Sequence, residues 1–279
     1  MTPLVSIVCL CYNHNRFVGE ALQSVFDQTY PNIQLIVVDD CSMDGSAATI
    51  ERILQGRSSI PFLRKNSNIG NCRAFNEGLR MATGKYVIDL AADDILAVNR
   101  VEVGVALLES KPEYGVQFSD AEIIDEKGKL WGRHSDRFPH VSIPSGDIFV
   151  DVMSRYFINS PTMMIRKTVL DTLGGYDESL AYEDFDFWVR SSRRFYYLYT
   201  PEVLIKKRSL STSMGKRQYA KGSDQSRSTR VVCEKAFGLC KQKSEYSALK
   251  KRVAYEMRKV LFVGDWKTFW GYWSLWRKI

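Results

Sequence analysis

The sequence predicts an α/β fold with a mostly parallel central sheet and helices on both of its faces. In the first half of the chain, short apolar runs typical of buried strands alternate with helical segments of about ten residues. Parallel strands covered on both faces have this continuous apolar character. Acid pairs give a second indication, because Asp39-Asp40, Asp93-Asp94 and Glu183-Asp184 each follow an apolar run. Open α/β sheets bind ligands beyond the carboxyl ends of their strands, so we expect a site there.

The elements follow from hydrophobic spacing and from turn signals. In the first half, strands are expected at 5–10, 33–38, 60–63 and 86–90, and helices at 17–25, 46–54 and 72–81. A helix around 99–110 and a strand at 114–119 follow, and then a loose stretch to Pro144 with a hairpin tip at 127–129. The second half is expected to hold strands at 162–165, 195–199 and 203–207, and helices that open at Lys167 and at Glu183-Asp184.

Length and composition exclude several classes of protein. With 279 residues and 45% apolar residues, the chain can bury the core of one domain plus an appendage, and it is not disordered. Its start has no basic leader, and no uncharged apolar stretch approaches about 18 residues, so we expect no secretion signal and no membrane span. The six cysteines form no C-x-x-C pair and are expected to be reduced thiols in a cytosol.

Charge divides the chain into two unequal parts. Residues 206–279 carry 19 basic and 5 acidic side chains, whereas residues 1–205 carry 20 basic and 27 acidic ones. From Ser213 the pattern is polar, basic and helical, so we expect a domain at 1–212 and a helical extension at 213–279. Such cations suit anionic lipid headgroups, a phosphorylated acceptor or nucleic acid.

Familiar nucleotide and zinc motifs are missing from the sequence. No G-x-G-x-x-G follows the first strand and no Gly-Lys precedes Ser or Thr, which argues against dinucleotide enzymes and P-loop NTPases. The histidines at 14, 134 and 140 fit no zinc spacing. If a metal binds, we expect oxygen ligands, as Mg²⁺ or Mn²⁺ takes beside a diphosphate, and Asp93-Asp94 fits that description. The pair could instead cap the following helix.

A series of motifs, taken in order, closely resembles family 2 glycosyltransferases over roughly residues 3–210. The motifs are Val5-Ser6-Ile7-Val8, Tyr12-Asn13-His14-Asn15, Gln28-Thr29-Tyr30, Val37-Val38-Asp39-Asp40-Cys41-Ser42-Met43-Asp44-Gly45-Ser46, Asn68-Ile69-Gly70, Ala82-Thr83-Gly84-Lys85-Tyr86, Asp93-Asp94, Gly174-Gly175-Tyr176-Asp177-Glu178 and Glu183-Asp184. The resemblance implies a Rossmann-like GT-A fold, a nucleotide-diphosphate-sugar donor, a divalent cation and inversion at the anomeric carbon.

The metal motif departs from the commonest form of the family. Many members carry Asp-x-Asp-Asp, whereas this chain has Ala91-Ala92-Asp93-Asp94, and its nearest earlier acid is Asp89. The resemblance aligns Asp93 with the acid that holds the metal, so one protein carboxylate would anchor Mn²⁺ or Mg²⁺ and the diphosphate would complete the site. A histidine near the late strand of many relatives is replaced here by Lys206-Lys207-Arg208, which could neutralise the leaving phosphate.

The resemblance also implies the base and the donor site. Asp184 aligns with the carboxylate that takes the proton of the acceptor hydroxyl, and Glu183 and Trp188 are expected on the acceptor side. Glu183 or Asp184 could instead serve as a helix cap. Asp40 would face the base or ribose of the donor, or it could simply be buried at the end of its strand. Arg73 would face the phosphates, or it could form an ion pair at the surface. The expected donor-binding residues are Cys11, Tyr12, Asn13, Asp40, Asn68, Gly70, Arg73 and Asp94.

The basic extension ends in aromatic residues that form one stripe on a helical wheel. At 100° per residue the stripe spans about 120° and basic residues flank it, a pattern typical of a helix that lies in a lipid headgroup layer. It could instead pack on the first domain or on a second subunit. Nucleic acid is disfavoured, because the aromatics are not spread among the cations. The stripe comprises Phe262, Trp266, Phe269, Trp270, Trp273 and Trp276.

Together these observations predict a cytoplasmic inverting glycosyltransferase of the hexosyltransferase type, peripheral on the inner face of the cell membrane. It would move a sugar from a UDP-sugar to a hydroxyl of a glycan or lipid-linked glycan, as in the synthesis of lipopolysaccharide and other surface polysaccharides. One alternative is a sugar nucleotidyltransferase, which usually has a Gly-rich basic opening that is absent here. The other is a non-catalytic nucleotide-sugar-binding module, which Ala91 makes conceivable.

Overall fold

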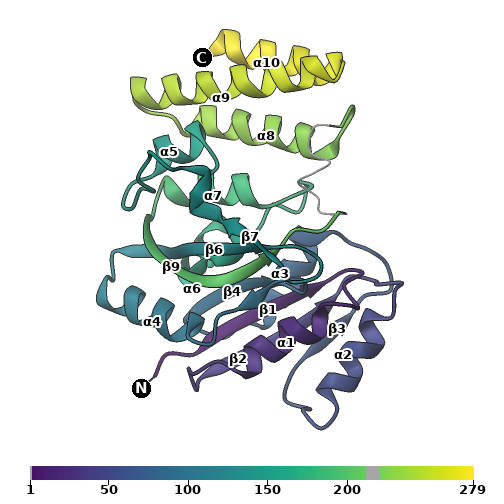
Figure 1. The fold of residues 1–279 in the computed structure, drawn as a ribbon. Coiled ribbons are helices and arrows are strands. Elements are labelled where there is room, and N and C mark those ends of the chain that lie inside the picture. The colour runs from purple at the N-terminus through teal and green to yellow at the C-terminus, as the bar shows by residue number, and fades with distance from the viewer. Residues whose placement is uncertain (1, 212–219) are drawn as a thin grey trace.

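The computed structural model describes residues 2–211 and 220–279, and its described strands form one sheet (Figure 1). The strand order is β3-β2-β1-β4-β8-β6-β9-β5, and β7 pairs with β6. Neighbours among β3, β2, β1 and β4 are parallel, as are β6 and β9, so the predicted mostly parallel sheet is confirmed. The strands are β1 (Val5–Cys11), β2 (Ile33–Asp39), β3 (Phe62–Arg64), β4 (Tyr86–Ala91), β5 (Ile95–Leu96), β6 (Tyr114–Ile124), β7 (Leu130–Arg133), β8 (Met164–Arg166) and β9 (Tyr196–Arg208).

Helices cover both faces of this sheet. On one face α1, α2 and α4 pack against Val5, Ile7 and Cys9 of β1, and on the other face α3, α5, α6 and α7 share a core with Val8 and Leu10. Successive side chains of a strand point to opposite faces, so the apolar run of β1 serves both cores. The helices are α1 (Val18–Phe26), α2 (Ser46–Leu54), α3 (Asn71–Met81), α4 (Arg100–Ser110), α5 (Phe149–Ser154), α6 (Lys167–Leu173), α7 (Asp184–Ser192), α8 (Asp224–Leu239), α9 (Lys243–Phe262) and α10 (Trp266–Lys278), with short 3₁₀ turns at His134–Arg137 and Ser160–Thr162.

The last three helices extend one of these two cores. Figure 1 shows α8, α9 and α10 stacked at the end of the molecule opposite α1 and α2. Cys233, Leu249 and Tyr272, one from each helix, are buried in the same hydrophobic cluster as Val8 of β1. The helical extension therefore shares its core with the sheet. The predicted domain boundary between residues 212 and 213 lies outside the described residues.

A buried ion-pair network joins α8 to α7. Asp186 of α7 is 1% exposed, and Lys235 of α8 places its Nζ 2.6 Å from Asp186 Oδ1 and 2.5 Å from Asp177 Oδ2. Arg190 Nε lies 2.6 Å from the second oxygen of Asp186. A buried carboxylate is stable only with such partners. The network thereby positions both α7 and the segment before it.

The element boundaries depart from the sequence prediction in three places. One strand, β9, spans both predicted strands at 195–199 and 203–207, because its register against β6 shifts around Pro201 and a bulge accommodates that residue. Two short elements, β5 and α5, are not predicted, since so few residues carry no periodicity. All six cysteines are free.

Close packing of α3 on the sheet can be tested at Gly78. A Cβ added there would lie 2.4 Å from Val8 Cγ1 and 3.3 Å from Val38 Cγ2. We expect Gly78→Ala to lower the free energy of unfolding by about 1–2 kcal/mol, because overpacking outweighs the gain in helix propensity. Urea unfolding followed by circular dichroism measures the change.

The matched control is Gly238→Ala in α8, where an added Cβ would meet no heavy atom within 4 Å. This variant should be unchanged or more stable by up to about 1 kcal/mol. Equal stability of the two variants would contradict the close approach of α3 to β1.

Candidate active site

Three parallel strands end at one edge of the sheet, where the acids were predicted. The last residue of β1, Cys11, pairs with Asp39, which ends β2. Leu10 of β1 pairs with Ala91, which ends β4. The loops after these strands therefore start side by side, which is the usual position of a ligand site in an open α/β sheet.

Hydrogen bonds tie the loop after β1 to the loop after β2. Asn13 N–H donates to Ser42 Oγ at 2.9 Å, and Met43 N–H donates to Asn13 Oδ1 at 2.8 Å. Asn13 has a φ of +58°, which Asn tolerates better than most residues. Among the predicted donor residues, Tyr12 is 47% exposed, whereas Cys11 is buried and burial raises the pKa of its thiol to about 12. Tyr12 thus presents its ring at this edge, and the thiol of Cys11 stays neutral.

Asp40 supports the loop that leads into α3. Its two carboxylate oxygens accept hydrogen bonds from the N–H groups of Ile69 (2.7 Å) and Gly70 (2.9 Å). Asn68 Nδ2 donates to the Asp40 carbonyl oxygen at 3.4 Å. Bonds from N–H groups to a carboxylate are among the stronger hydrogen bonds. The structure therefore brings the predicted Asp40, Asn68 and Gly70 together, but with Asp40 bound to the protein itself.

Asp39 is the member of that acid pair with an unused oxygen. Its Oδ2 accepts a hydrogen bond from Ser42 N–H at 3.0 Å, and its Oδ1 is buried without a partner among the described residues. A buried carboxylate oxygen in this state indicates a missing donor. The resemblance assigned the donor-binding role to Asp40. Two adjacent acids at a strand end differ only in the side of the strand they face, so the sequence does not show which of them has an oxygen without a partner.

The start of α3 contacts the segment that leads into α7. Asn71 Nδ2 donates to Glu183 Oε2 at 2.5 Å. Arg73 Nε lies 3.6 Å from Glu178 Oε2, and the Arg73 side chain is 57% exposed. Arg73 thus makes the surface ion pair that was the alternative interpretation, and such exposed pairs are weak. Its guanidinium remains accessible to an anionic ligand.

Asp94 is held by the end of β9. Its Oδ1 accepts a hydrogen bond from Arg208 N–H at 2.8 Å. Burial and the neighbouring Asp93 hold the pKa of the Asp94 carboxyl well above its usual range, and Lys207 partly offsets the rise. The acid pair does not cap α4, which begins at Arg100. The structure therefore places Asp94 inside the protein, with one oxygen used internally.

The buried side chain of Arg208 holds the loop after β4 by hydrogen bonds. Its buried guanidinium donates to the carbonyl oxygens of Asp93 (3.0 Å) and Asp125 (3.2 Å) and to Glu20 Oε2 (2.6 Å). These contacts occupy the group that was expected to neutralise phosphate. In the same basic segment, Lys206 remains exposed at the surface.

Asp93 points toward a histidine that sequence reasoning did not select. His14, in the loop after β1, places its Nδ1 3.8 Å from Asp93 Oδ1. No group of three or more His, Cys, Asp or Glu residues within 2–211 and 220–279 is arranged to hold a metal ion. A metal site with Asp93 as its single protein carboxylate stays a prediction. No spacing rule links His14 to Asp93, because folding alone makes them neighbours.

Three carboxyl groups gather between β4 and α7. Glu183 and Asp184 open α7, and Asp89 lies on β4, where Tyr176 OH donates to its Oδ2 at 3.1 Å. Burial, with the charge of Asp184 adding to it, raises the pKa of Asp89 to about 7. Burial, then Asp184 and Asp89, hold the pKa of Glu183 well above its usual range. Asp184 Oδ1 is buried and has no hydrogen-bond partner in the described chain.

This carboxyl cluster adjoins the acids that follow β4. Burial raises the pKa of the Cys9 thiol, and the nearby charges of Asp89, Asp93 and Asp94 add to the rise, just as the charge of Asp184 adds to the raised pKa of Asp89. Acids from the end of β4 and from the start of α7 thus share one region at the strand-end edge. Glu183, the N-cap of α7, makes no side-chain capping bond, so the helix-cap alternative receives no support there.

Trp188, expected on the acceptor side, is buried in α7. It is 4% exposed, and its ring lies 5.8 Å from that of Tyr156 between centroids. Its Nε1 has no hydrogen-bond partner among the described residues. The indole therefore contributes packing beneath the carboxyl cluster and offers no open face.

The C-terminal aromatic stripe is divided between two helices and two environments. Phe262 ends α9, and the turn at Gly264 separates it from α10. The buried residues of α10, Thr268, Tyr272 and Leu275, lie on the side of the helix opposite Trp266 and Trp270. Trp266 and Trp270 (both 59% exposed) and Trp273 are open, whereas Phe269 and Trp276 pack partly against the core.

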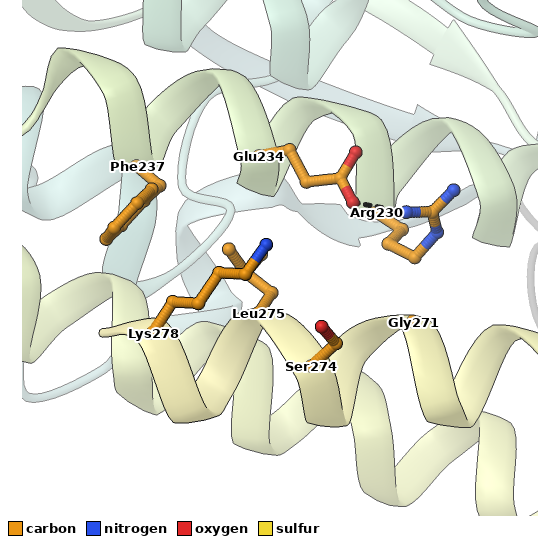
Figure 2. A pocket seen from close by; sticks show the side chains of 7 residues that line it. All are labelled: Arg230, Glu234, Phe237, Gly271, Ser274, Leu275 and Lys278. Atoms are coloured by element: carbon orange, nitrogen blue, oxygen red, sulfur yellow. Dashed lines mark hydrogen bonds and ion pairs between the residues drawn. The ribbon is translucent and has the colours of Figure 1, made fainter.

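A separate cavity of about 380 Å³ lies between α8 and α10. Figure 2 shows Arg230 and Glu234 of α8 paired with each other across from Lys278 and Ser274 of α10. None of its lining residues is a predicted donor, metal or base residue. This cavity belongs to the helical layers and not to the strand-end edge.

Solved structures with similar folds define the class. A chain described as mannosyltransferase PcManGT from Pyrobaculum calidifontis in complex with GDP-Man and Mn²⁺ has a TM-score of 0.69 at 16% identity, covering 99% of this chain and 74% of that one. S. aureus TarS 1–349 in complex with UDP-GlcNAc has a TM-score of 0.66 at 15% identity, covering 93% and 71%. The fold is that of the GT-A class.

Sequence comparison specifies the family. Residues 6–174 match the profile of glycosyl transferase family 2. An uncharacterized glycosyltransferase of Haemophilus influenzae is 30% identical over 220 residues, covering 74% of this chain and 65% of that protein. One of Rickettsia prowazekii is 33% identical over 211 residues, covering 74% and 64%. The chain belongs to glycosyl transferase family 2, and it spans somewhat less than two thirds of the length of these relatives.

The raised pKa of Asp89 predicts a pH-dependent stability. Because its folded-state pKa of about 7 exceeds the usual value of 3.8, the folded chain binds more protons, and stability falls as pH rises from about 4 through about 7. We expect Asp89→Asn, which can still accept from Tyr176, to reduce the loss of stability between about pH 5 and about pH 8. Urea unfolding at the two pH values measures it.

The control is Asp171→Asn on the exposed side of α6, which should leave the pH dependence of the parent unchanged. Glu183 also has a raised pKa, so a smaller decline should persist in Asp89→Asn. An identical decline in the parent and in Asp89→Asn would show that Asp89 is ionised throughout this range.

Proposed function

We propose that this chain transfers a sugar from a nucleotide-diphosphate-sugar, with a UDP-sugar as the expected donor, to a hydroxyl of a glycan or lipid-linked glycan acceptor. The transfer is a single displacement that inverts the anomeric carbon. One observation carries the proposal: Asp184 has a buried oxygen without a partner, beside acids on β4 and at the edge where the parallel strands end. Family membership and the nucleotide-sugar complexes of GT-A relatives support it.

Asp184 is the general base of this proposal. It opens α7, where the helix dipole favours an anion, and its Oδ1, without a hydrogen-bond partner among the described residues, is the atom we propose to accept the proton of an acceptor hydroxyl. Glu183 is bound to Asn71 and has a raised pKa, which makes it the weaker candidate for an ionised base at neutral pH. An inverting transfer requires one such base and no protein nucleophile.

Asp93 is the proposed anchor of a divalent cation, Mn²⁺ or Mg²⁺. Its carboxylate is partly exposed at the same edge, whereas Asp94 is used inside the protein. One protein carboxylate with diphosphate and water oxygens is a common way of binding such ions. When bound, the cation would stabilise the negative charge that gathers on the leaving diphosphate.

The base assignment is tested by Asp184→Asn. We expect nucleotide-sugar turnover to fall by about 10²–10⁴-fold, the usual contribution of a general base, while UDP affinity stays within about threefold. Turnover is measured as nucleotide release from UDP-sugars and GDP-sugars with Mn²⁺, with and without glycan acceptors, and affinity by calorimetry.

Two further variants sharpen this test. Glu183→Gln should lose less activity than Asp184→Asn, and Asp171→Asn should lose none. Full turnover in Asp184→Asn would remove its role. Pyrophosphate release from a nucleoside triphosphate and a sugar phosphate would indicate a nucleotidyltransferase instead, and tight binding without transfer or hydrolysis a non-catalytic module.

We further propose that the exposed stripe of α10 contacts an anionic membrane surface on the cytoplasmic side. Trp266, Trp270 and Trp273 are open on the side of α10 that does not pack on the protein, and the exposed Lys267 and Lys278 lie on the same helix. This combination suits the headgroup layer. Asp265 is the N-cap of α10 and its side chain accepts a hydrogen bond from Thr268 N–H, so its negative charge stabilises the start of the helix. Within the described residues no helix is long and apolar enough to cross a bilayer.

Membrane contact is tested by the double variant Trp266→Ala, Trp270→Ala. We expect its partition onto vesicles with about 30% phosphatidylglycerol to fall by about tenfold or more, because two large apolar groups are lost from the headgroup contact. Co-sedimentation with the vesicles measures the partition.

The control for this test is Trp131→Ala on β7, where the indole is similarly exposed. It should partition like the parent. Equal partition of the double variant and the parent would contradict the proposal. A parent dimer that the double variant abolishes would favour the alternative that the stripe meets a second subunit.

A further inference from the structure

The loop after β1 places an imidazole beside the proposed cation anchor. His14 Nδ1 lies 3.8 Å from Asp93 Oδ1, beyond hydrogen-bond distance, and Nδ1 is buried without a hydrogen-bond partner among the described residues. A buried ring nitrogen with no partner is costly and indicates a missing partner at that point. The carboxylate of Asp93 lies too far away to supply it by a hydrogen bond.

The backbone of this loop holds His14 in place. His14 N–H donates to Ser46 Oγ at 3.0 Å, and the His14 carbonyl oxygen accepts from the N–H groups of Phe17 and Val18 at the start of α1. The loop is thus fixed both to the loop after β2 and to the first turn of a buried helix. These bonds fix the backbone from which the imidazole extends toward Asp93.

The other acids near β4 are unsuited to a second place on a cation at Asp93. Asp94 is buried, with one oxygen bound to Arg208 N–H. Asp89 accepts from Tyr176 and faces Asp184. At the end of β4, where many relatives carry an acid, this chain has the half-buried Ala91. A second protein ligand must therefore come from another element, and His14 is the neighbour that the structure supplies.

The distance between His14 and Asp93 agrees with a shared ion. Two ligand atoms that each lie about 2.1 Å from one metal ion are roughly 3.0–4.2 Å apart for angles between 90° and 180°. The observed 3.8 Å lies between these limits and exceeds the roughly 3.0 Å expected for neighbouring ligands of an octahedral ion, so the two side chains would move closer on binding. A carboxylate plus an imidazole, completed by diphosphate and water oxygens, suits Mn²⁺ better than Mg²⁺, which prefers oxygen ligands alone.

We infer that His14 Nδ1 and Asp93 together form the protein side of the divalent-cation site, and that His14 replaces the acid missing at Ala91. This inference rests on the proposed function, because the diphosphate of the donor is expected to supply the remaining ligands. It predicts that the chain is selective for Mn²⁺ over Mg²⁺, and it differs from the sequence-based expectation that all the ligands are oxygens.

The test is Mn²⁺ binding to the full chain in the presence of UDP, followed by calorimetry and by pulsed EPR. In the parent, the EPR signal of bound Mn²⁺ should show coupling to an imidazole nitrogen. In His14→Ala this coupling should vanish and Mn²⁺ affinity should fall about tenfold or more, while UDP affinity without metal stays unchanged. The control His140→Ala, at an exposed loop position, should behave like the parent.

A compensating variant makes the test independent of misfolding. Adding Ala91→Asp to His14→Ala should restore binding of divalent cations, now with Mg²⁺ bound about as well as Mn²⁺, because the new ligand is a carboxylate. A His14→Ala variant that fails to fold would be identified by its circular dichroism, and Ala91→Asp in the parent background should then still weaken the preference for Mn²⁺.

The outcomes separate this inference from the proposed function. Unchanged Mn²⁺ affinity in His14→Ala, or no nitrogen coupling in the parent, overturns the inference while sugar transfer can still be observed. Weaker UDP binding without metal in His14→Ala would show a direct phosphate contact and also overturn it. A parent chain that binds neither UDP nor UDP-sugars contradicts the proposed function itself.

Discussion

A carboxylate buried inside a protein must be hydrogen-bonded, paired with a cation or protonated, and the candidate site follows from how each acid meets this constraint. Asp40 accepts two backbone hydrogen bonds, and Asp186 pairs with Lys235 and Arg190. Asp89 and Glu183 meet the constraint through raised pKa values. These acids build the frame of the site.

Three acids remain incompletely satisfied, and they outline where a ligand would lie. Asp39 and Asp184 each have a buried oxygen without a partner in the described structure, and Asp93 faces a histidine at a distance too long for a hydrogen bond. Functional sites are often the places where local rules of stability are broken. The fully paired acids hold the loops, so that the three others can interact with a donor, a cation and an acceptor.

Much of the fold was predictable from local patterns, whereas side-chain roles within the site were not. Strand and helix periods identified the first half of the sheet, because buried strands and amphipathic helices repeat at different intervals. The continuous strand β9 was not predicted, because a proline such as Pro201 usually indicates the end of a strand in a sequence. In the structure the strand continues past Pro201 through a bulge. Asp40 and Trp188 were selected by alignment to a family, yet one holds a loop and the other is buried.

By itself, the sequence determined the α/β class, the edge of the sheet where the acids lie, membership of glycosyl transferase family 2 and the basic character of the extension. These features depend on periodicity, motif order and composition, all of which are local. Only the tertiary structure decided which acid of each pair is free, and that His14 stands beside Asp93. Such facts depend on contacts between residues far apart in the chain. A single hydrogen bond decides whether a carboxylate holds a loop of the protein or can interact with a ligand.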